Sequence, residues 1–333
     1  MFENMCRGSG GGGFGGGGGG GFGGGGGFGD MFSGMGGMGG MPGMGGFGGG
    51  GSRGGGRGSP RQQQRQEAPP VFTKNDPSGV VALGKPKFPD SESKHPWLML
   101  FYDKDKAQQD AEYVSLAKQL SEQVLKKAKN KKNAVIFKVG AVDCSGDGRS
   151  FCQKKLGKGV DLPAFATVLN GSVSVVTDDA ALRSAKKLHD HTTDALLKIE
   201  GLVINVNSVE HIRSRLLASS SATPGQPSIA ILLLSDKYET SPIYASLSYR
   251  HRSDSFAGFG ESRGKNLQLA KLFALKQYPT LVALIGNEDK VEQYSGTSFD
   301  LESLSKWLDG LSKKHFKSQS RTTDSRRKKQ RAR

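Results

Sequence analysis

Two cysteines, Cys144 and Cys152, are the residues of this sequence whose type and spacing could support chemistry. They lie eight positions apart, at the expected end of one strand and on the helix that follows it. A disulfide needs Cα atoms within about 7 Å, and the intervening loop is long enough to allow that approach. The residues leave two alternatives open, a structural disulfide or a pair of inert, half-buried thiols. Three cysteines in all are too few for a disulfide-dense scaffold or a four-thiolate zinc site.

The histidines do not suggest a metal centre. His189 and His191 are two positions apart and point to different faces of the expected helix, so they cannot share one ion. His211, His251 and His315 are isolated, and no two further ligands lie at zinc spacing. We therefore expect neither a metal nor a cofactor.

The elements that must position the two cysteines alternate between strands and helices. A continuous apolar run over 97–102 is typical of a central strand that is buried on both faces. Apolar residues recur every three to four positions over 105–128, which predicts an amphipathic helix. The whole first half predicts the order β β α β α β β α over 80–83, 97–102, 105–128, 134–139, 150–156, 165–169, 172–176 and 179–197.

A similar order repeats in the second half of the chain. Strands are predicted over 202–206, 229–234, 256–260, 280–285 and 291–295, with helices over 209–218, 241–250, 266–275 and 301–311. Two copies of one pattern imply two copies of one domain. Parallel strands joined by helices require right-handed crossovers and a covered sheet. We therefore predict an α/β protein with tandem domains over 70–200 and 201–312, each a central mixed sheet flanked by helices.

The two ends of the chain have a different composition. Residues 1–69 are rich in Gly, Phe and Met and then in Arg-Gly and Gln, and 313–333 carry ten Lys or Arg against one Asp. Both segments are expected to be disordered. No run of about 18 apolar residues is present, so no membrane span is expected. The basic residues leave an alternative function open, RNA or other nucleic-acid binding through Arg53, Arg57, Arg326, Arg327, Lys328 and Lys329.

Several stretches resemble one family. Residues 271–282, including Tyr278-Pro279-Thr280, followed by 291–297 and 301–308, resemble the cis-proline strand and the closing strand and helix of thioredoxin-like, protein disulfide isomerase-like modules. In the first half, 97–102 resembles the strand that leads to the active site. Residues 142–165 resemble the stretch from the third strand to the cis-proline loop. The resemblance covers about 80–311, and it implies that Pro163 and Pro279 are the cis-prolines.

The same resemblance implies that the catalytic residues are missing. Catalysis in this family needs Cys-x-x-Cys at the start of the helix after the second strand, where the helix dipole lowers the pKa of the first thiol. The matching positions here hold no cysteine; they are Asp105, Lys106, Gln108, Lys237, Glu239 and Thr240. We therefore expect no oxidoreductase activity of the usual kind.

The amino-terminal tract carries a second resemblance. Its Gly/Phe-rich composition and the motif Asp30-Met31-Phe32-Ser33-Gly34-Met35 resemble the region that follows the J domain in DnaJ-type Hsp70 cochaperones. The His-Pro-Asp tripeptide of a J domain is absent from the sequence. We expect a truncated gene product that lacks its J domain, with Hsp70 as a partner only where that domain precedes this sequence.

These observations favour a redox-inactive, thioredoxin-like protein-folding accessory, or a DnaJ-type cochaperone fragment, that binds unfolded or partly folded polypeptides. The expected compartment is the lumen of the endoplasmic reticulum if a signal peptide precedes the sequence, and otherwise the cytoplasm or nucleus. Nucleic-acid association through the basic residues is the alternative.

Overall fold

The structure is a computed structural model of the 333-residue chain, and it describes residues 70–129, 131, 134–217, 228–286 and 290–316. The predictions on residues 1–69 and 317–333 lie outside the described residues, and so do the nucleic-acid candidates Arg53, Arg57, Arg326, Arg327, Lys328 and Lys329. The tail predicted to be disordered begins at 313, but 313–316 are the end of a helix, where Lys314 and His315 contact Glu292, so the prediction is wrong for these four residues. Among the helices of the described part, none is long and apolar enough to cross a membrane.

The first domain is built on a five-stranded sheet in the order β1-β3-β2-β4-β5. Its strands are β1 (Val81–Leu83), β2 (Trp97–Tyr102), β3 (Lys138–Asp143), β4 (Ala164–Leu169) and β5 (Ser172–Val175). Strand β2 pairs in parallel with β3 and antiparallel with β4. All six of its residues are buried, as its continuous apolar run predicts.

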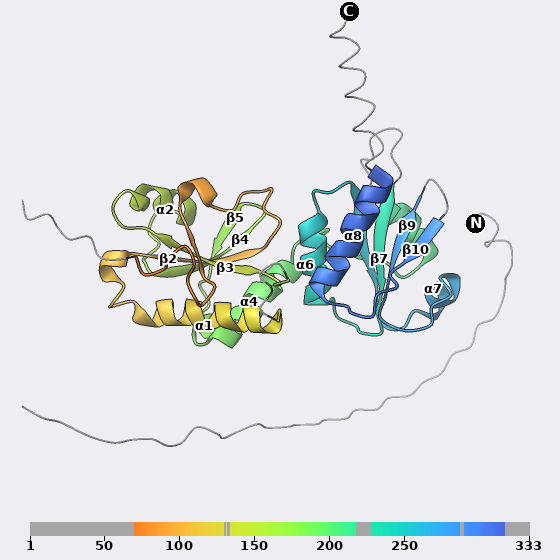
Figure 1. Ribbon diagram of the computed structural model, residues 1–333, viewed down its shortest axis with the longest axis horizontal. Coiled ribbons are helices and arrows are strands. Elements are labelled where there is room, and N and C mark those ends of the chain that lie inside the picture. The colour runs from red at the N-terminus through yellow and green to blue at the C-terminus, as the bar shows by residue number, and fades with distance from the viewer. Residues whose placement is uncertain (1–69, 130, 132–133, 218–227, 287–289, 317–333) are drawn as a thin grey trace, which may run out of the picture. The chain divides into compact units, whose positions relative to one another are not determined.

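Helices cover both faces of this sheet (Figure 1). Helices α1 and α4 share one core with alternate residues of β2, and α2 shares the other. Asp103 accepts a hydrogen bond from the backbone N–H of Asp105 and so caps the 3₁₀ turn η2. The helical elements are η1 (Lys85–Lys87), η2 (Lys104–Lys106), α1 (Ala111–Lys127), α2 (Gly148–Leu156), α3 (Asp179–Leu182) and α4 (Ala185–Leu197).

The second domain repeats the arrangement with the sheet order β10-β9-β7-β8-β6. Its strands are β6 (Ile204–Asn205), β7 (Ile229–Leu234), β8 (Phe256–Ser262), β9 (Thr280–Ile285) and β10 (Lys290–Gln293). Strand β7 takes the central place of β2, because it pairs in parallel with β8 and antiparallel with β9.

Two cores again lie on the two faces of the second sheet. Helices α6 and α8 pack on one face, and η3 and α7 pack on the other. The helices are α5 (Val209–His211), the π-helical η3 (Ile212–Leu217), α6 (Pro242–His251), α7 (Leu267–Leu272) and α8 (Leu301–Phe316). The predicted fold class, two tandem thioredoxin-like α/β domains with mixed sheets flanked by helices, is confirmed in the described residues.

Several predicted elements have other bounds in the structure. The strand predicted over 202–206 is only Ile204–Asn205, and the helix predicted over 209–218 is a short α-helix followed by a π-helix. Three other predicted elements differ in the first domain. The strand predicted over 134–139 is present as β3 but begins four residues later, because pairing with β2 starts at Lys138. The buried Val135 and Phe137 lie in the preceding bend, where they fill the α1 core. The helix predicted over 179–197 is two helices, since Ser184 caps a new start at Ala185. The helix predicted from residue 105 begins at Ala111, after the η2 turn.

Candidate functional site

In each sheet, a cis-proline lies beside one end of the central strand. The Leu162–Pro163 and Tyr278–Pro279 peptide bonds are both cis. The residues that follow these prolines begin β4 and β9, where Ala164 pairs with Phe101 and Thr280 pairs with Leu234. Both prolines therefore lie at the carboxyl end of the central strand, and this end of each sheet is the candidate site.

In the first domain, the turn after β2 is held by carboxylates. Besides the cap from Asp103, the Oδ1 of Asp143 accepts from the backbone N–H of Lys104 at 3.4 Å and of Ser145 at 2.9 Å. The predicted site residues Asp105, Lys106 and Gln108 are exposed on or beside this turn. The turn thus presents charged and amide groups, with no thiol among them.

In the second domain, a buried ion pair supports the corresponding turn. Lys237 and Glu239 are exposed, whereas the Oγ1 of Thr240 accepts a hydrogen bond from Arg263 at 2.6 Å. The same guanidinium donates from Nε to the Oε2 of Glu261 at 3.1 Å, and Glu261 is fully buried. The sequence reasoning missed this pair. Its only signal was an acidic residue at the end of an apolar strand.

The Glu261 carboxylate also affects a buried tyrosine. Burial, and then the charge of Glu261, raises the pKa of Tyr244 well above its usual value of 10. The Tyr244 hydroxyl donates at 2.7 Å to the carbonyl of Gly260. Tyr244 is therefore held as a neutral hydrogen-bond donor inside the α6 core, where it packs the helix onto the sheet.

Cys144 and Cys152 are joined by a disulfide, with a Cα–Cα distance of 5.8 Å. Cys144 directly follows β3, and Cys152 lies in the middle of α2; their exposed fractions are 1% and 2%. Neither sulfur is accessible, and neither lies at a helix N-terminus, one of the settings that lower the pKa of a thiol. The disulfide ties α2 to the sheet at the end where Pro163 lies.

Two large apolar side chains are exposed at the corresponding end of the second sheet. Tyr238 is 82% exposed and Leu267 is 78% exposed, and these two are the exposed large hydrophobic residues of the described part. Pro279 is exposed as well. We call Tyr238, Leu267 and Pro279 the apolar patch. Of these three residues, the sequence predicted only Pro279. The exposure of Tyr238, in a turn, and of Leu267, at the first position of α7, cannot be predicted from the sequence pattern.

Backbone contacts hold the segments of the apolar patch together. The N–H of Gly264 donates to the carbonyl of Lys237 at 3.0 Å, and that of Lys265 donates to Ser235 at 3.1 Å. The Tyr278 hydroxyl donates to the carbonyl of Asn266 at 3.4 Å. The segments that carry Tyr238, Leu267 and Pro279 are therefore bonded to one another.

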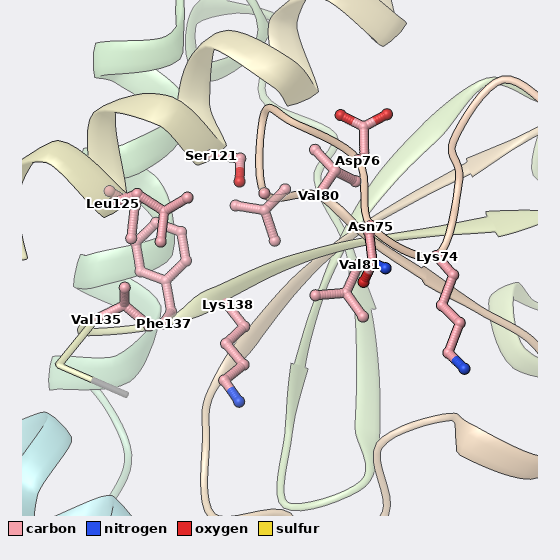
Figure 2. Close-up of a pocket in the computed structure, with 13 residues that line it drawn as sticks. Lys74, Asn75, Asp76, Val80, Val81, Ser121, Leu125, Val135, Phe137 and Lys138 are labelled. Atoms are coloured by element: carbon pink, nitrogen blue, oxygen red, sulfur yellow. The ribbon is translucent and has the colours of Figure 1, made fainter. Parts of the chain in front are cut away.

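A small pocket lies at the opposite end of the first sheet (Figure 2). It holds about 90 Å³, and its apolar wall includes Val80, Val135 and Phe137. Asp76 at the edge of the pocket accepts hydrogen bonds from the backbone N–H and the hydroxyl of Ser78, so its carboxylate already has partners within the loop. The pocket is far smaller than an ordinary ligand site. We therefore assign it no role.

No cluster of three or more His, Cys, Asp or Glu side chains that could hold a metal ion lies among the described residues. This finding concerns the described ranges alone. The predicted absence of a metal and of a cofactor stays a prediction for the whole chain.

Comparisons with known proteins give remote structural neighbours. No family model matches the chain, and no curated protein matches it. A solved structure of ERdj5, form II, is 15% identical to this chain with a TM-score of 0.28. The match covers 69% of this chain and 28% of the ERdj5 chain. The zinc-bound form of human ERp44 is 14% identical to this chain with a TM-score of 0.32. The match covers 69% of this chain and 56% of the ERp44 chain.

A third neighbour is the J-Trx1 fragment of ERdj5, which is 18% identical with a TM-score of 0.29 and covers 37% of this chain and 54% of its own. The chain thus spans little more than half, or less, of each of these neighbours. Values this low support no argument about function.

Proposed function

We propose that this protein is a redox-inactive, thioredoxin-like folding accessory that binds unfolded polypeptide at the carboxyl end of its second sheet. The proposal rests on the two exposed large hydrophobic residues of the described part, Tyr238 and Leu267, which lie on hydrogen-bonded segments at the end of the sheet where cis-Pro279 lies. Contiguous exposed apolar surface is a mark of protein-binding sites, and the bonded segments bring these residues to one end of the sheet.

The absence of redox activity is supported by the residues at the two turns. Thiol–disulfide exchange begins with attack by an accessible thiolate. The turn in the first domain presents Asp105, Lys106 and Gln108, and the turn in the second presents Lys237 and Glu239. The one cysteine pair of the described residues is bonded and buried, and it is not part of either turn.

The size of the apolar patch supports weak and unselective binding. Full burial of a large apolar side chain contributes about 1.5–3 kcal/mol. Tyr238 and Leu267 together therefore supply only a few kcal/mol, from which the cost of ordering an unfolded chain must be subtracted. Such a surface suits a protein that holds many clients briefly.

We further propose the lumen of the endoplasmic reticulum as the compartment. Disulfides persist in oxidising compartments and are rare in the cytosol, and Cys144–Cys152 is a closed, buried bridge. Alkylation of freshly lysed cells tests this: the pair should resist modification until a reductant is added. Immediate modification of both thiols would contradict the proposed location.

The central test measures suppression of client aggregation by the full chain. Light scattering of a chemically denatured client should fall in the presence of the wild-type protein, and the double variant Y238S/L267S should lose most of this effect. The control is K237S/Q268S, which changes the exposed polar neighbours of the same two residues. Equal suppression by both double variants would refute the patch, and none by the wild type would refute polypeptide binding.

A further inference from the structure

A cavity of about 350 Å³ lies beside the disulfide of the first domain. Its apolar lining includes Cys144, Cys152, Leu156 and Leu162. Leu162 immediately precedes cis-Pro163, so the cavity lies at the same end of the sheet as the first-domain turn. A volume of this size is at the lower end of ordinary ligand sites and suits a single side chain with its flanking backbone.

Two cations line this cavity, and no carboxylate does. Arg149 and Lys158 are both exposed, and neither side chain makes a hydrogen bond or ion pair with another residue of the described part. The guanidinium and the ammonium give the lining two positive charges, which the exposed carboxylate of Asp161, between the lining residues Val160 and Leu162, offsets only in part. The cavity is therefore complementary to a negative group that is attached to an apolar one.

The loop that carries Lys158 leaves the cavity open. Gly157 and Gly159 flank this lysine at φ values of +92° and +86°, a backbone region that side chains rarely adopt. A Cβ atom placed on either glycine would meet nothing within 4 Å. Open space therefore borders both sides of Lys158, and a bound segment can reach its ammonium group.

We propose that this cavity binds an acidic-apolar segment of polypeptide, with an apolar side chain against Leu156, Leu162 and the disulfide and an Asp or Glu beside Arg149 and Lys158. This proposal rests on the proposed function and names the client sequence that the first domain selects. A free inorganic anion would leave the apolar lining uncovered, so a peptide that carries both groups fits better. Charge complementarity then supplies specificity more than affinity.

The test measures fluorescence anisotropy of two labelled peptides with the full chain. The peptides differ only in the residues beside a central leucine, Glu-Leu-Glu in one and Lys-Leu-Lys in the other. We expect the acidic peptide to bind at least tenfold more tightly, with a preference that falls as salt rises. The variant R149Q/K158Q should lose about five- to tenfold in affinity for the acidic peptide.

The control variant K154Q/K187Q removes two exposed positive charges of the same domain that do not line the cavity. It should leave the affinity for the acidic peptide within about twofold of the wild type. An equal loss in this control would show a general charge effect and overturn the proposal, as would equal binding of both peptides. Displacement of the peptide by low-millimolar inorganic phosphate would assign the cavity to a free anion instead.

The two proposals fail separately. If R149Q/K158Q binds the acidic peptide as the wild type does while Y238S/L267S loses client suppression, only the acidic-apolar site is overturned. If Y238S/L267S suppresses aggregation normally while R149Q/K158Q loses the acidic peptide, only the apolar patch is overturned. If no polypeptide binds at all, both are wrong.

Discussion

Arg263 donates its Nε–H to the Oε2 of Glu261 at 3.1 Å, so a partly exposed guanidinium neutralises a carboxylate that is completely buried. The same guanidinium reaches Thr240 at 2.6 Å. It therefore links the core of the second sheet to the turn before α6, one of the two turns at which the family resemblance expects cysteine. This turn is supported by an ion pair instead of a disulfide.

Removal of the cation should destabilise the second domain strongly. In Arg263→Met the Glu261 carboxylate stays buried without a partner, which costs about 3 kcal/mol in the free energy of unfolding. The double variant E261Q/R263M should recover much of that loss, because the buried charge is gone. Urea unfolding measures both, with the exposed Arg149→Met as a control that stays within about 0.5 kcal/mol. Equal stability of Arg263→Met and the control would show that the ion pair does not support the fold.

Loss of the disulfide should lower the stability of the protein. The bridge joins two cysteines that are eight positions apart in the sequence. For a loop of this length, the loss of chain entropy in the unfolded state predicts about 2–3 kcal/mol of stabilisation. Cys144→Ser should therefore lower the unfolding free energy by this amount, which urea unfolding measures. An insulin-reduction assay accompanies the measurement. Activity in the wild type that Cys144→Ser abolishes would contradict the redox-inactive proposal.

Gly264 should be needed for the position of Tyr238. Its φ is +73°, and a Cβ atom there would lie 2.7 Å from the Cε1 of Tyr238. Gly264→Ala should therefore cost about 1–2 kcal/mol in stability and also displace the ring. Gly201→Ala is the matched control, because its φ is +70° and its Cβ would meet nothing within 4 Å.

Both glycine variants should lose similar stability in chemical denaturation. Only Gly264→Ala should weaken client binding, by about threefold. If both variants bind the client with the same affinity, Tyr238 does not depend on the contact at Gly264.

The stability of the first domain should fall in mild acid because of His95. Burial, followed by the charges of Arg250, Lys138 and Lys94, lowers the pKa of His95 from 6.5 to about 3. The unfolded chain binds a proton below pH 6.5, whereas the folded chain does so only near pH 3. The contribution of His95 is therefore complete above pH 6.5 and decreases by about 1.4 kcal/mol for each pH unit below it.

Urea unfolding at pH 6.5, 5.5 and 4.5 measures this slope. His95→Gln should flatten it by the equivalent of one proton, since glutamine does not titrate. Buried His189 has a pKa lowered by burial and remains in both proteins, so it contributes equally to the two slopes. Identical slopes would show that His95 is protonated in the folded state.

The fold was predictable where burial alone determines the pattern. The strands predicted over 229–234 and 280–285 match β7 and β9 residue for residue, because both are buried on both faces and appear as continuous apolar runs. The run over 134–139 looked the same, yet Val135 and Phe137 fill a core without pairing. Tertiary packing, which a local pattern does not contain, decides between these outcomes.

The candidate site was predictable only in part. The prolines before β4 and β9 followed from short motifs, and the missing cysteines followed from direct inspection. The exposure of Tyr238 and Leu267 depends on which loops pair with each other, such as Lys237 with Gly264, and composition does not encode that pairing. The cations at the disulfide cavity were equally hidden, because isolated Arg and Lys residues are common on any surface.

Hydrogen–deuterium exchange of the full chain, with and without a reduced and alkylated unfolded client, tests the central claim most directly. An alkylated client offers no thiol or disulfide, so any protection comes from non-covalent binding. We expect slower exchange over 236–238, 264–268 and 277–280 of the wild type, and no such change in Y238S/L267S. Protection confined to other segments, or unchanged in the double variant, would contradict this claim.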